Sequence, residues 1–467
     1  MKEYTPDKIR NIALIGHQDT GKTMVSEAIL YVTGATSRMG RVEDGNTMMD
    51  TTPEETERQI SIQASLAYCE FKNNKINLLD TPGYEDFVGE VVGALDVVEC
   101  TAVLIRADGG VEVGTEKVWD YARTRNLPSI FCVNKMDKEH ADFDKCIQQL
   151  QEHFGRSAVP VQIPIGQGDS FKGIVDLLSG KAYEYTTDGK GKCTEVDIPD
   201  DIKDKADAMR RELLESAAEN DEELMEKYLE SETLTTEEAC KGLAVGVAAG
   251  DVYPVFCMSA ETNIGTVQFL EGIVNLAPSP VDRPQKLADS EEVLAADASE
   301  PAAAKVFKNI SESHVGDMLF LRVFQGTLAG GSDIFNSTRN ASDRLGQLFH
   351  LQGKTRSDTG KLTAGDLGAA VKLKEAHIGD TLCTKAKPVE IPQTDYPKGT
   401  IFSAIEGAAK GDEDKIGAGL NRLKEEDPTF DVRVDNEIRQ TLISGQGELH
   451  LDIIVGRLKS RYGVEVI

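Results

Sequence analysis

The chain has 467 residues, enough for about three domains, and its 40% hydrophobic and 28% charged residues are ordinary for a globular protein. The net charge of −28 argues against a surface that coats nucleic acid, although local basic patches could still contact a ribonucleoprotein. No apolar run approaches the ~20 residues of a membrane span, and the N-terminus has no signal-peptide core. The eight cysteines form no Cys-x-x-Cys pair, so we expect a cytoplasmic protein with free thiols, without disulfides or zinc.

A glycine-rich stretch near the N-terminus, Gly16–Thr23, matches the Gly-x-x-x-x-Gly-Lys-Thr pattern of loops that wrap the phosphates of a nucleoside triphosphate. It lies between an apolar run at 11–15, which predicts a buried strand, and a helix-like segment at 24–31. Lys22 would bring a positive charge to the outer phosphates, and Thr23 a hydroxyl ligand to Mg²⁺. The loop residues predicted to bind nucleotide are His17, Gln18, Asp19, Thr20, Gly21, Lys22 and Thr23.

The first 155 residues alternate short apolar runs with helix-like segments, which predicts a mainly parallel sheet with helices on both faces. The expected strands are 11–15, 76–79, 101–107 and 129–134, and the expected helices are 22–33, 84–98, 114–126 and 142–154. Residues 38–61 are polar and show neither a helical nor a strand period, so we expect a long loop that is functional or mobile.

Changes in composition after residue 155 predict an α/β multidomain protein. An inserted subdomain at 155–255 includes an acidic helical block at 201–249, and a strand at 252–258 with a helix at 265–276 then completes a first domain of residues 1–280. Residues 277–300 are rich in Pro, Ala and acid, which indicates a linker, placed at 281–300. Alternating strands and glycine turns predict a small β-barrel at 301–390, and an α/β sandwich of ferredoxin-like type follows at 395–467, with a last strand at 464–467.

A second motif in the first domain, Asp80-Thr-Pro-Gly83, follows the predicted strand 76–79. Asp80 would hold a water of Mg²⁺, and the N–H of Gly83 would bind the γ-phosphate. Alone, the pattern Asp-x-x-Gly also occurs in common turns, but after a phosphate loop and a polar loop it strongly indicates a nucleotide-binding motif.

A third motif, Asn134-Lys-Met-Asp137, ends another predicted strand and favours guanine over adenine. Asp137 would accept hydrogen bonds from N1–H and the 2-amino group of guanine, whereas adenine offers no such donor pair. Lys135 would cover the base plane, and Asn134 would tie the loops together. The backbone of Ser259–Ala260, after the strand at 252–258, would donate to guanine O6.

The ordered motifs resemble those of a translational GTPase, and residues 50–58 resemble the first switch of that group. The insertion, the barrel and the segments 425–430 and 443–451 are similar to elongation factor G over essentially the whole chain. This resemblance implies a cytoplasmic, monomeric GTPase with GTP, GDP and Mg²⁺ as ligands. It implies action on the ribosome, on both ribosomal RNA and ribosomal proteins, in translocation. That family has two further C-terminal domains, so we expect the chain to be part of a longer protein.

Three residues depart from the family pattern, all in the hydrolysis apparatus. Tyr84 stands where the family has the His that positions the attacking water, and a phenol stays neutral where imidazole can be charged. Gln59 replaces a glycine, and Ser61 replaces a threonine but keeps a hydroxyl for Mg²⁺. The predicted catalytic residues are Tyr84, Gly83 and Lys22, and the predicted metal ligands are Thr23, Ser61 and Asp80.

Several functions fit these motifs. The first is a ribosome-dependent GTPase that drives translocation or recycling, with neutral drift at the three departing positions and full activity. The second is a ribosome-binding switch with tight nucleotide binding and weak or altered hydrolysis, which the departures favour. A third is a ribosomal-protection or release-factor GTPase. A metabolic P-loop kinase is disfavoured by the third motif and the attached barrel.

Overall fold

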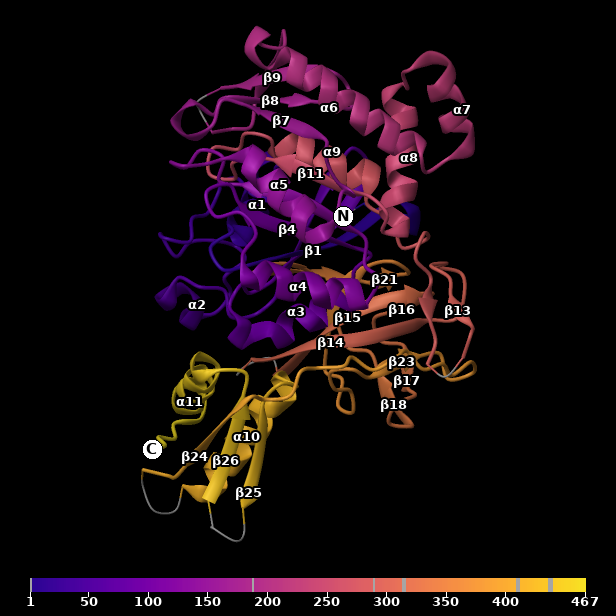
Figure 1. Cartoon of the computed structure of the whole chain (residues 1–467). Helices are drawn as coiled ribbons and strands as arrows, with labels where there is room; N and C mark the ends of the chain where they lie inside the picture. The colour runs from indigo at the N-terminus through magenta and orange to yellow at the C-terminus, as the bar shows by residue number, and fades with distance from the viewer. Residues whose placement is uncertain (1, 187–188, 289, 313–315, 409–411, 436–439) are drawn as a thin grey trace.

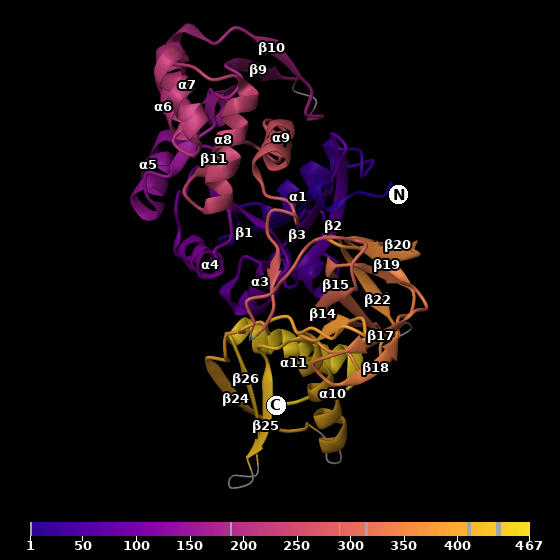
Figure 2. The same ribbon diagram turned by 90° about the vertical axis from the view of Figure 1, so that its right-hand side faces the viewer.

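The computed structural model describes residues 2–186, 189–288, 290–312, 316–408, 412–435 and 440–467. Figure 1 shows the first domain above, with its inserted subdomain at the top, and the barrel and the third domain below it. In the turned view of Figure 2, the barrel lies beside the third domain, and both face the lower edge of the first domain.

The first domain is built on a seven-stranded sheet in the order β2-β3-β1-β4-β5-β11-β6, in which β2 is antiparallel to β3 and the other neighbours are parallel. Every residue of β3 and β5 is buried, because helices and the barrel cover both faces. The strands are β1 (Ile9–Gly16), β2 (Ser65–Phe71), β3 (Asn74–Asp80), β4 (Cys100–Arg106), β5 (Ser129–Asn134), β6 (Ala158–Pro160) and β11 (Tyr253–Cys257). The helices are α1 (Lys22–Val32), α2 (Pro53–Arg58), α3 (Val88–Leu95), α4 (Val113–Thr124), α5 (Phe143–Phe154) and α9 (Thr266–Leu276), with a 3-10 turn η2 (Glu85–Phe87) before α3.

The segment 38–61 differs from the loop that its polarity predicted, because it contains helix α2. Pro53 occupies the first turn, and the Thr52 side chain accepts a hydrogen bond from Glu55 N while the Glu55 carboxylate accepts one from Thr52 N. Six residues are too short to show a helical period, so only this capping signature could have indicated the helix.

The inserted subdomain is an antiparallel sheet in the order β10-β9-β8-β7, flanked by three helices. Its elements are β7 (Gln162–Ile165), β8 (Gly173–Asp176), β9 (Lys181–Tyr185), β10 (Cys193–Val196), α6 (Asp200–Ala218), α7 (Glu222–Ser231) and α8 (Thr236–Ala249). The apolar run at 159–165 predicts one strand, but the structure has two, because Val161 separates β6 from β7. Since β6 pairs with β11 in the main sheet, the insertion starts after β6 and not at residue 155.

The barrel domain is an eight-stranded antiparallel sheet in the order β18-β17-β23-β14-β15-β22-β19-β20, with a separate β16–β21 pair. Its strands are β14 (Ala303–Glu312), β15 (Gly316–Gln325), β16 (Thr327–Ala329), β17 (Asp333–Asn336), β18 (Ala341–Arg344), β19 (Leu348–Gln352), β20 (Thr355–Thr359), β21 (Lys361–Thr363), β22 (Leu367–Val371) and β23 (Thr381–Cys383). Ile334 of β17 and Leu348 of β19 lie near opposite edges of the sheet but share one buried core. The sheet therefore curls around that core.

Residues 281–300 were expected to form a linker, but they contain a short hairpin of β12 (Gln285–Lys286) and β13 (Val293–Leu294). Leu294 is buried with Phe324 and Ile391, so the hairpin packs against the barrel. The few apolar residues of this acidic stretch, such as Leu287 and Leu294, follow neither a helical nor a strand period, which is why its packing was not predicted.

The third domain has a sheet in the order β24-β26-β25, packed against two helices. Its elements are β24 (Ile401–Ile405), α10 (Glu413–Glu426), β25 (Asp431–Asp435), β26 (Gln440–Gly445) and α11 (Glu448–Tyr462). The expected last strand is limited to an antiparallel bridge between Val466 and Gly407, with Ile467 N and Glu406 O 2.9 Å apart. This places the C-terminal segment beside β24, which gives the strand order of a ferredoxin-like sandwich.

The connector between the barrel and the third domain, residues 386–399, contains Pro388, Pro392 and Pro397. It packs along the barrel, because Lys305 Nζ donates to Pro392 O at 2.8 Å.

Candidate functional site

The phosphate loop has the backbone that its glycines predict. Gly21 has a φ of 87°, and Asp19 between the two glycines has a φ of 57°, both in the left-handed region. A Cβ at Gly21 would lie 2.5 Å from Asn134 Nδ2, so only glycine fits there. The loop leads directly into α1, whose N-terminal N–H groups add to an anion-binding site.

Lys22 lies buried at the centre of this loop. Its Nζ donates to Gly16 O at 3.0 Å and to His17 O at 2.8 Å. Burial lowers the pKa of Lys22, and nearby carboxylates only partly offset this effect. A phosphate anion beside Nζ would therefore stabilise the charged form of Lys22.

Gly83 lies directly over the phosphate loop. A Cβ on it would lie 2.7 Å from both Lys22 Nζ and Gln18 Cα, so no larger residue fits without displacing the loop. The structure thus brings the second motif against the first, as their order in the chain predicted. His17 lies to one side, with its Nε2 3.7 Å from Glu112 Oε1.

The three predicted metal ligands lie together. Thr23 Oγ1 donates to Asp80 Oδ2 at 2.7 Å and lies 3.0 Å from Ser61 Oγ. Asp80 Oδ1 is buried and accepts no hydrogen bond from the described residues. Burial is the main cause that raises the pKa of Asp80, so a cation beside it would stabilise the carboxylate. An unsatisfied carboxylate oxygen next to two hydroxyls is a donor set that suits Mg²⁺.

Sequence reasoning missed a further oxygen at this cluster. Ser61 Oγ donates to Asp50 Oδ1 at 3.1 Å, and Thr47 Oγ1 donates to Asp50 Oδ2 at 2.7 Å. Asp50 is only 6% exposed. Its place at the start of the segment that resembles a first switch was the signal available in the sequence.

Two other buried carboxylates hold the segment 40–63 in place, and neither was predicted. Glu55 accepts hydrogen bonds from the backbone N–H groups of residues 51 and 52 through Oε2, and of residues 62 and 63 through Oε1, each at 2.9 Å. Glu27 accepts from Gly40 N at 3.0 Å and from the N–H groups of residues 48 and 49. Ser61 is thus positioned by a fixed backbone.

The predicted guanine-side residues surround the other end of the phosphate loop. Asn134 Nδ2 donates to Thr20 O at 2.9 Å, and its Oδ1 accepts from Ala260 N at 3.0 Å, so this side chain bridges three loops. Asp137 Oδ1 is buried and unpaired among the described residues. A carboxylate oxygen in that state is an acceptor for a ligand with two N–H donors. Lys135 has a φ of 64°, which marks a constrained turn.

Ser259–Ala260 differs from expectation in one respect. Ser259 N donates to Ile264 O at 3.0 Å, and Ala260 N is engaged by Asn134. Both N–H groups are therefore used within the protein, and neither is free for guanine O6 in this conformation. The segment instead supports the loop that carries Asp137.

Tyr84 packs against an apolar side-chain cluster. It is half-buried against a hydrophobic cluster of Ile62, Phe87 and Ile453, which Ile60 and Leu449 also contact. Ile453 and Leu449 belong to α11 of the third domain, so the position that the family uses for hydrolysis here takes part in an interdomain contact.

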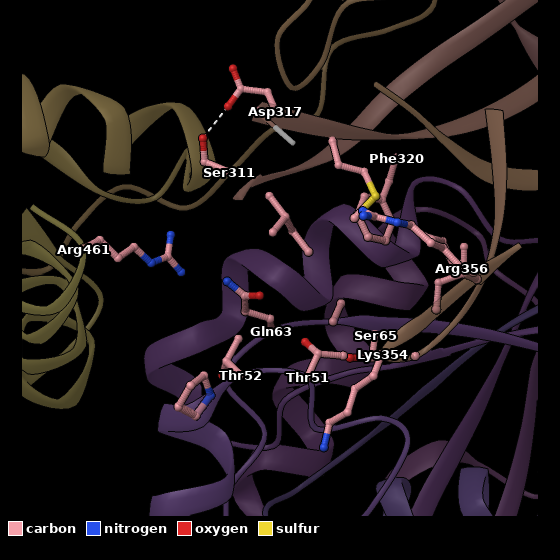
Figure 3. A pocket seen from close by; sticks show the side chains of 18 of the residues that line it. Thr51, Thr52, Gln63, Ser65, Ser311, Asp317, Phe320, Lys354, Arg356 and Arg461 are labelled. Carbon is pink, nitrogen blue, oxygen red and sulfur yellow. Dashed lines mark hydrogen bonds between the residues drawn. The ribbon is translucent and has the colours of Figure 1, made fainter. Parts of the chain in front are cut away.

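A cleft of about 950 Å³ opens at the junction of the three domains, away from the phosphate loop. Figure 3 shows Thr51, Thr52 and Gln63 of the first domain facing Arg461 of the third, with Asp317 and Arg356 of the barrel on the other sides. Its charged groups are largely paired: Arg461 with Glu426, for example, at 2.9 Å. None of the phosphate-loop residues lines it.

The parallel sheet, with its phosphate loop and base-side loops, defines the class of P-loop nucleotide-binding proteins. The profile of the elongation factor Tu GTP-binding domain matches residues 7–279, that of elongation factor G domain 2 matches 301–385, and that of elongation factor G domain III matches 396–467. A crystal structure of a protein from Thermus thermophilus superimposes with a TM-score of 0.89 at 35% identity, covering 99% of this chain and 67% of that one.

The chain belongs to the elongation factor G family of translational GTPases. Membership implies guanine-nucleotide binding, and proteins of this family generally act on the ribosome. Within the described ranges, no helix combines the length and apolar character needed to cross a bilayer. In the same ranges, no cluster of three or more His, Cys, Asp or Glu side chains could hold a metal ion.

Proposed function

We propose that this protein binds GTP and GDP with Mg²⁺, hydrolyses GTP on the ribosome, and serves translocation in elongation as a cytoplasmic monomer. The observation that carries the proposal is the pair of unsatisfied buried carboxylate oxygens, Asp80 Oδ1 and Asp137 Oδ1, at the two ends of one phosphate loop. The Asp80 oxygen suits a cation, and the Asp137 oxygen suits a base with two N–H donors. A guanine nucleotide with Mg²⁺ supplies both.

In hydrolysis, water attacks the γ-phosphorus, the bond to the β-phosphate oxygen breaks, and GDP and phosphate leave. Lys22 would stabilise the charge that develops on the phosphates, and the Gly83 N–H would hold the γ-phosphate. Thr23, Ser61 and Asp80 would hold Mg²⁺, which neutralises charge on the β- and γ-phosphates when bound. Tyr84 would have to orient the water through its neutral hydroxyl.

A second candidate is a ribosome-binding switch that hydrolyses GTP slowly. The observation that favours it is that Tyr84, at the position of the family's histidine, packs against an apolar cluster. Where positioned proton-transfer groups have been tested, they contribute ~10²–10⁴ in rate.

Base specificity tests the nucleotide site directly. Asp137→Asn replaces an acceptor with a donor, so the affinity for GTP should fall by about 10²-fold or more, while xanthosine triphosphate should bind better than to the unaltered protein. Asp120→Asn, at an exposed carboxylate on α4, is the matched control. Equal affinity of the unaltered protein for ATP and GTP would contradict the proposal.

Turnover distinguishes the two candidates. Ribosome-stimulated GTP hydrolysis is compared between the full-length protein and its Tyr84→His variant at saturating GTP. A hydrolysis rate that is ~10²-fold higher in the variant supports the slow switch. Equal and fast rates in both exclude it and leave the translocation GTPase.

A further inference from the structure

An ion-paired bridge links the segment that resembles a first switch to the loop beside the base site. Arg41 Nη2 lies 2.7 Å from Glu261 Oε1, and Lys138 Nζ lies 2.7 Å from Glu261 Oε2. One carboxylate therefore pairs with two cations that come from segments far apart in the chain. The side chains of Arg41, Glu261 and Lys138 are 48%, 37% and 44% exposed, so the bridge lies at the surface.

The two base-side members of the bridge are chain neighbours of residues in the predicted base site. Lys138 follows Asp137, and its Nζ lies 3.5 Å from Asp137 Oδ2. Glu261 follows Ala260, whose N–H donates to Asn134 Oδ1 at 3.0 Å. Glu261 thus competes with Asp137 for one ammonium group and holds it at the shorter distance, which leaves the Asp137 carboxylate available to a base.

On the switch side, Arg41 extends from a backbone that is fixed to helix α1. The N–H of Gly40 donates to Glu27 Oε2 on α1 at 3.0 Å, and the N–H of Arg41 donates to Asn46 Oδ1 at 2.7 Å. A Cβ at Gly40 would lie 2.7 Å from Glu27 Oε2, so the backbone passes too close to this carboxylate for a side chain. Because α1 begins directly after the phosphate loop, the bridge extends a fixed framework from that loop to the base side.

A second contact joins the same two regions. Asn263 is fully buried, and its Nδ2 lies 3.3 Å from Met39 Sδ and donates to Gly189 O at 2.8 Å. The loop 259–263 therefore contacts the switch segment at two nearby points, Met39 and Arg41. The ion pair of Arg41 is thus part of an interface and not an isolated surface pair.

We propose that Glu261 is a positioning residue whose ion pairs with Arg41 and Lys138 close the switch segment onto the base loop and slow the release of bound guanine nucleotide. The inference rests on the proposed function for its ligand. A nucleotide whose Mg²⁺ is held by Ser61 and whose base is held by Asp137 must separate from both regions before it leaves. Because the bridge joins these regions, its opening becomes part of the release step.

The exposure of the three side chains determines the size and the salt dependence of the effect. Ion pairs that solvent reaches each contribute little, and dissolved salt screens them. Two such pairs on one carboxylate should change the rate of nucleotide release by about three- to ten-fold at low ionic strength.

The test is the rate at which the full chain releases a fluorescent GDP analogue into excess GDP, followed by stopped flow at low salt and at about 0.5 M KCl. Glu261→Gln should release the analogue about five-fold faster than the unaltered protein at low salt, and the two rates should converge at high salt. Arg41→Gln should release it about three-fold faster, and the double variant should be no faster than Glu261→Gln. Glu57→Gln, at an exposed carboxylate on α2, changes the net charge equally and should leave the rate unchanged.

Three results would overturn the inference. The first is equal release from Glu261→Gln and the unaltered protein at low salt. The second is a difference that persists at high salt, because ion pairs would then not be its cause. The third is a double variant in which the effects of the two single substitutions multiply, because Arg41 and Glu261 would then act independently.

A measurement without ligand separates this inference from the proposed function. If the unaltered chain bound no guanine nucleotide, the proposed function would fail, and hydrogen–deuterium exchange at the amides of 40–50 would test the bridge instead. Glu261→Gln should speed exchange there by about three-fold at low salt, whereas Glu57→Gln should not. Unchanged exchange in Glu261→Gln would reject the bridge.

Discussion

The first domain meets the barrel and the third domain through two different kinds of interface. Against the barrel, buried ion pairs accompany an apolar core that the two domains share. Lys75 Nζ lies 2.7 Å from Asp366 Oδ1, and Arg322 lies 2.5 Å from Glu99. Phe307, Phe320 and Phe349 of the barrel are buried in the same cluster as the first-domain sheet. Lys75 and Arg322 are each 1% exposed. Against the third domain, the contact is the small apolar cluster around Phe87, with half-buried residues at its rim.

The difference concerns what happens when each interface opens. Separating the barrel would expose the extensive apolar surface that it shares with the core of the first domain. Separating α11 exposes only a few apolar side chains, at roughly 25 cal/mol per Å². The barrel interface is therefore the more costly of the two to open, and the α11 interface is the less costly.

The largest expected effect comes from breaking one ion pair in the barrel interface. Arg322→Met leaves the Glu99 carboxylate buried without its cation, so the free energy of unfolding should fall by about 3–5 kcal/mol. Urea unfolding followed by the fluorescence of Trp119, the single tryptophan, measures it. Arg344→Met, at an exposed position on β18, should change it by at most ~0.5 kcal/mol. A loss below ~1 kcal/mol for Arg322→Met would contradict the importance of this ion pair to the interface.

A smaller and local effect is expected at the apolar interface. Ile453→Ala removes buried methyl groups from the cluster and should destabilise the docked third domain by about 2–3 kcal/mol. The loss should appear as faster proteolysis of 440–467 while the Trp119 transition stays near its original midpoint. Val434→Ala, at a residue that is 66% exposed on β25, serves as the control. A shift of both readouts together would mean that the two interfaces are not independent.

A pH effect is expected at the barrel interface. Burial, reinforced by the charge of Lys75, lowers the pKa of His350 from 6.5 to about 4. Between these values the unfolded chain binds a proton that the folded protein does not, so stability falls as pH drops from about 6.5 to 4. The loss should be about 1–2 kcal/mol and should disappear in His350→Gln. Unfolding midpoints at pH 7.5 and 4.5 measure it, and an unchanged pH dependence in the variant would refute this assignment.

The smallest effect is expected far from both interfaces. Lys424 and Asp431 form an ion pair at 2.5 Å within the third domain, but their side chains are 49% and 58% exposed. Solvent screens such a pair, so Lys424→Ala should change the free energy of unfolding by less than ~0.5 kcal/mol. A thermal unfolding loss above ~1 kcal/mol would show that this surface pair matters more than its exposure predicts.

The sequence predicted most reliably the elements whose signal is local. The strand at 129–134 was predicted to the residue, because a fully buried parallel strand is a continuous apolar run. The phosphate loop was placed by its glycines and lysine. In contrast, β2 was missed because its mixed composition reflects contact with the barrel, where Gly353 N donates to Leu66 O at 2.9 Å.

The parts of the site that were missed depend on partners distant in the chain. Glu55 accepts hydrogen bonds from backbone N–H groups on both sides of α2. Every residue except proline has a backbone N–H, so the sequence does not indicate which of them a carboxylate will bind. Asp50 was seen as part of a segment but not as a neighbour of Ser61. Tyr84 was predicted as a replaced catalytic residue, but its packing against α11 required knowledge of where the third domain lies.

The proline-containing connector limits the directions in which the third domain can swing. Proline fixes φ near −65°, so Pro388, Pro392 and Pro397 remove three soft torsions from residues 386–399. The Lys305 bond to Pro392 O further fixes its middle to the barrel. A displacement of the third domain would therefore be taken up mainly by the part of the connector that follows Pro392. The far edge of the third domain, at β25, would then sweep the longest arc.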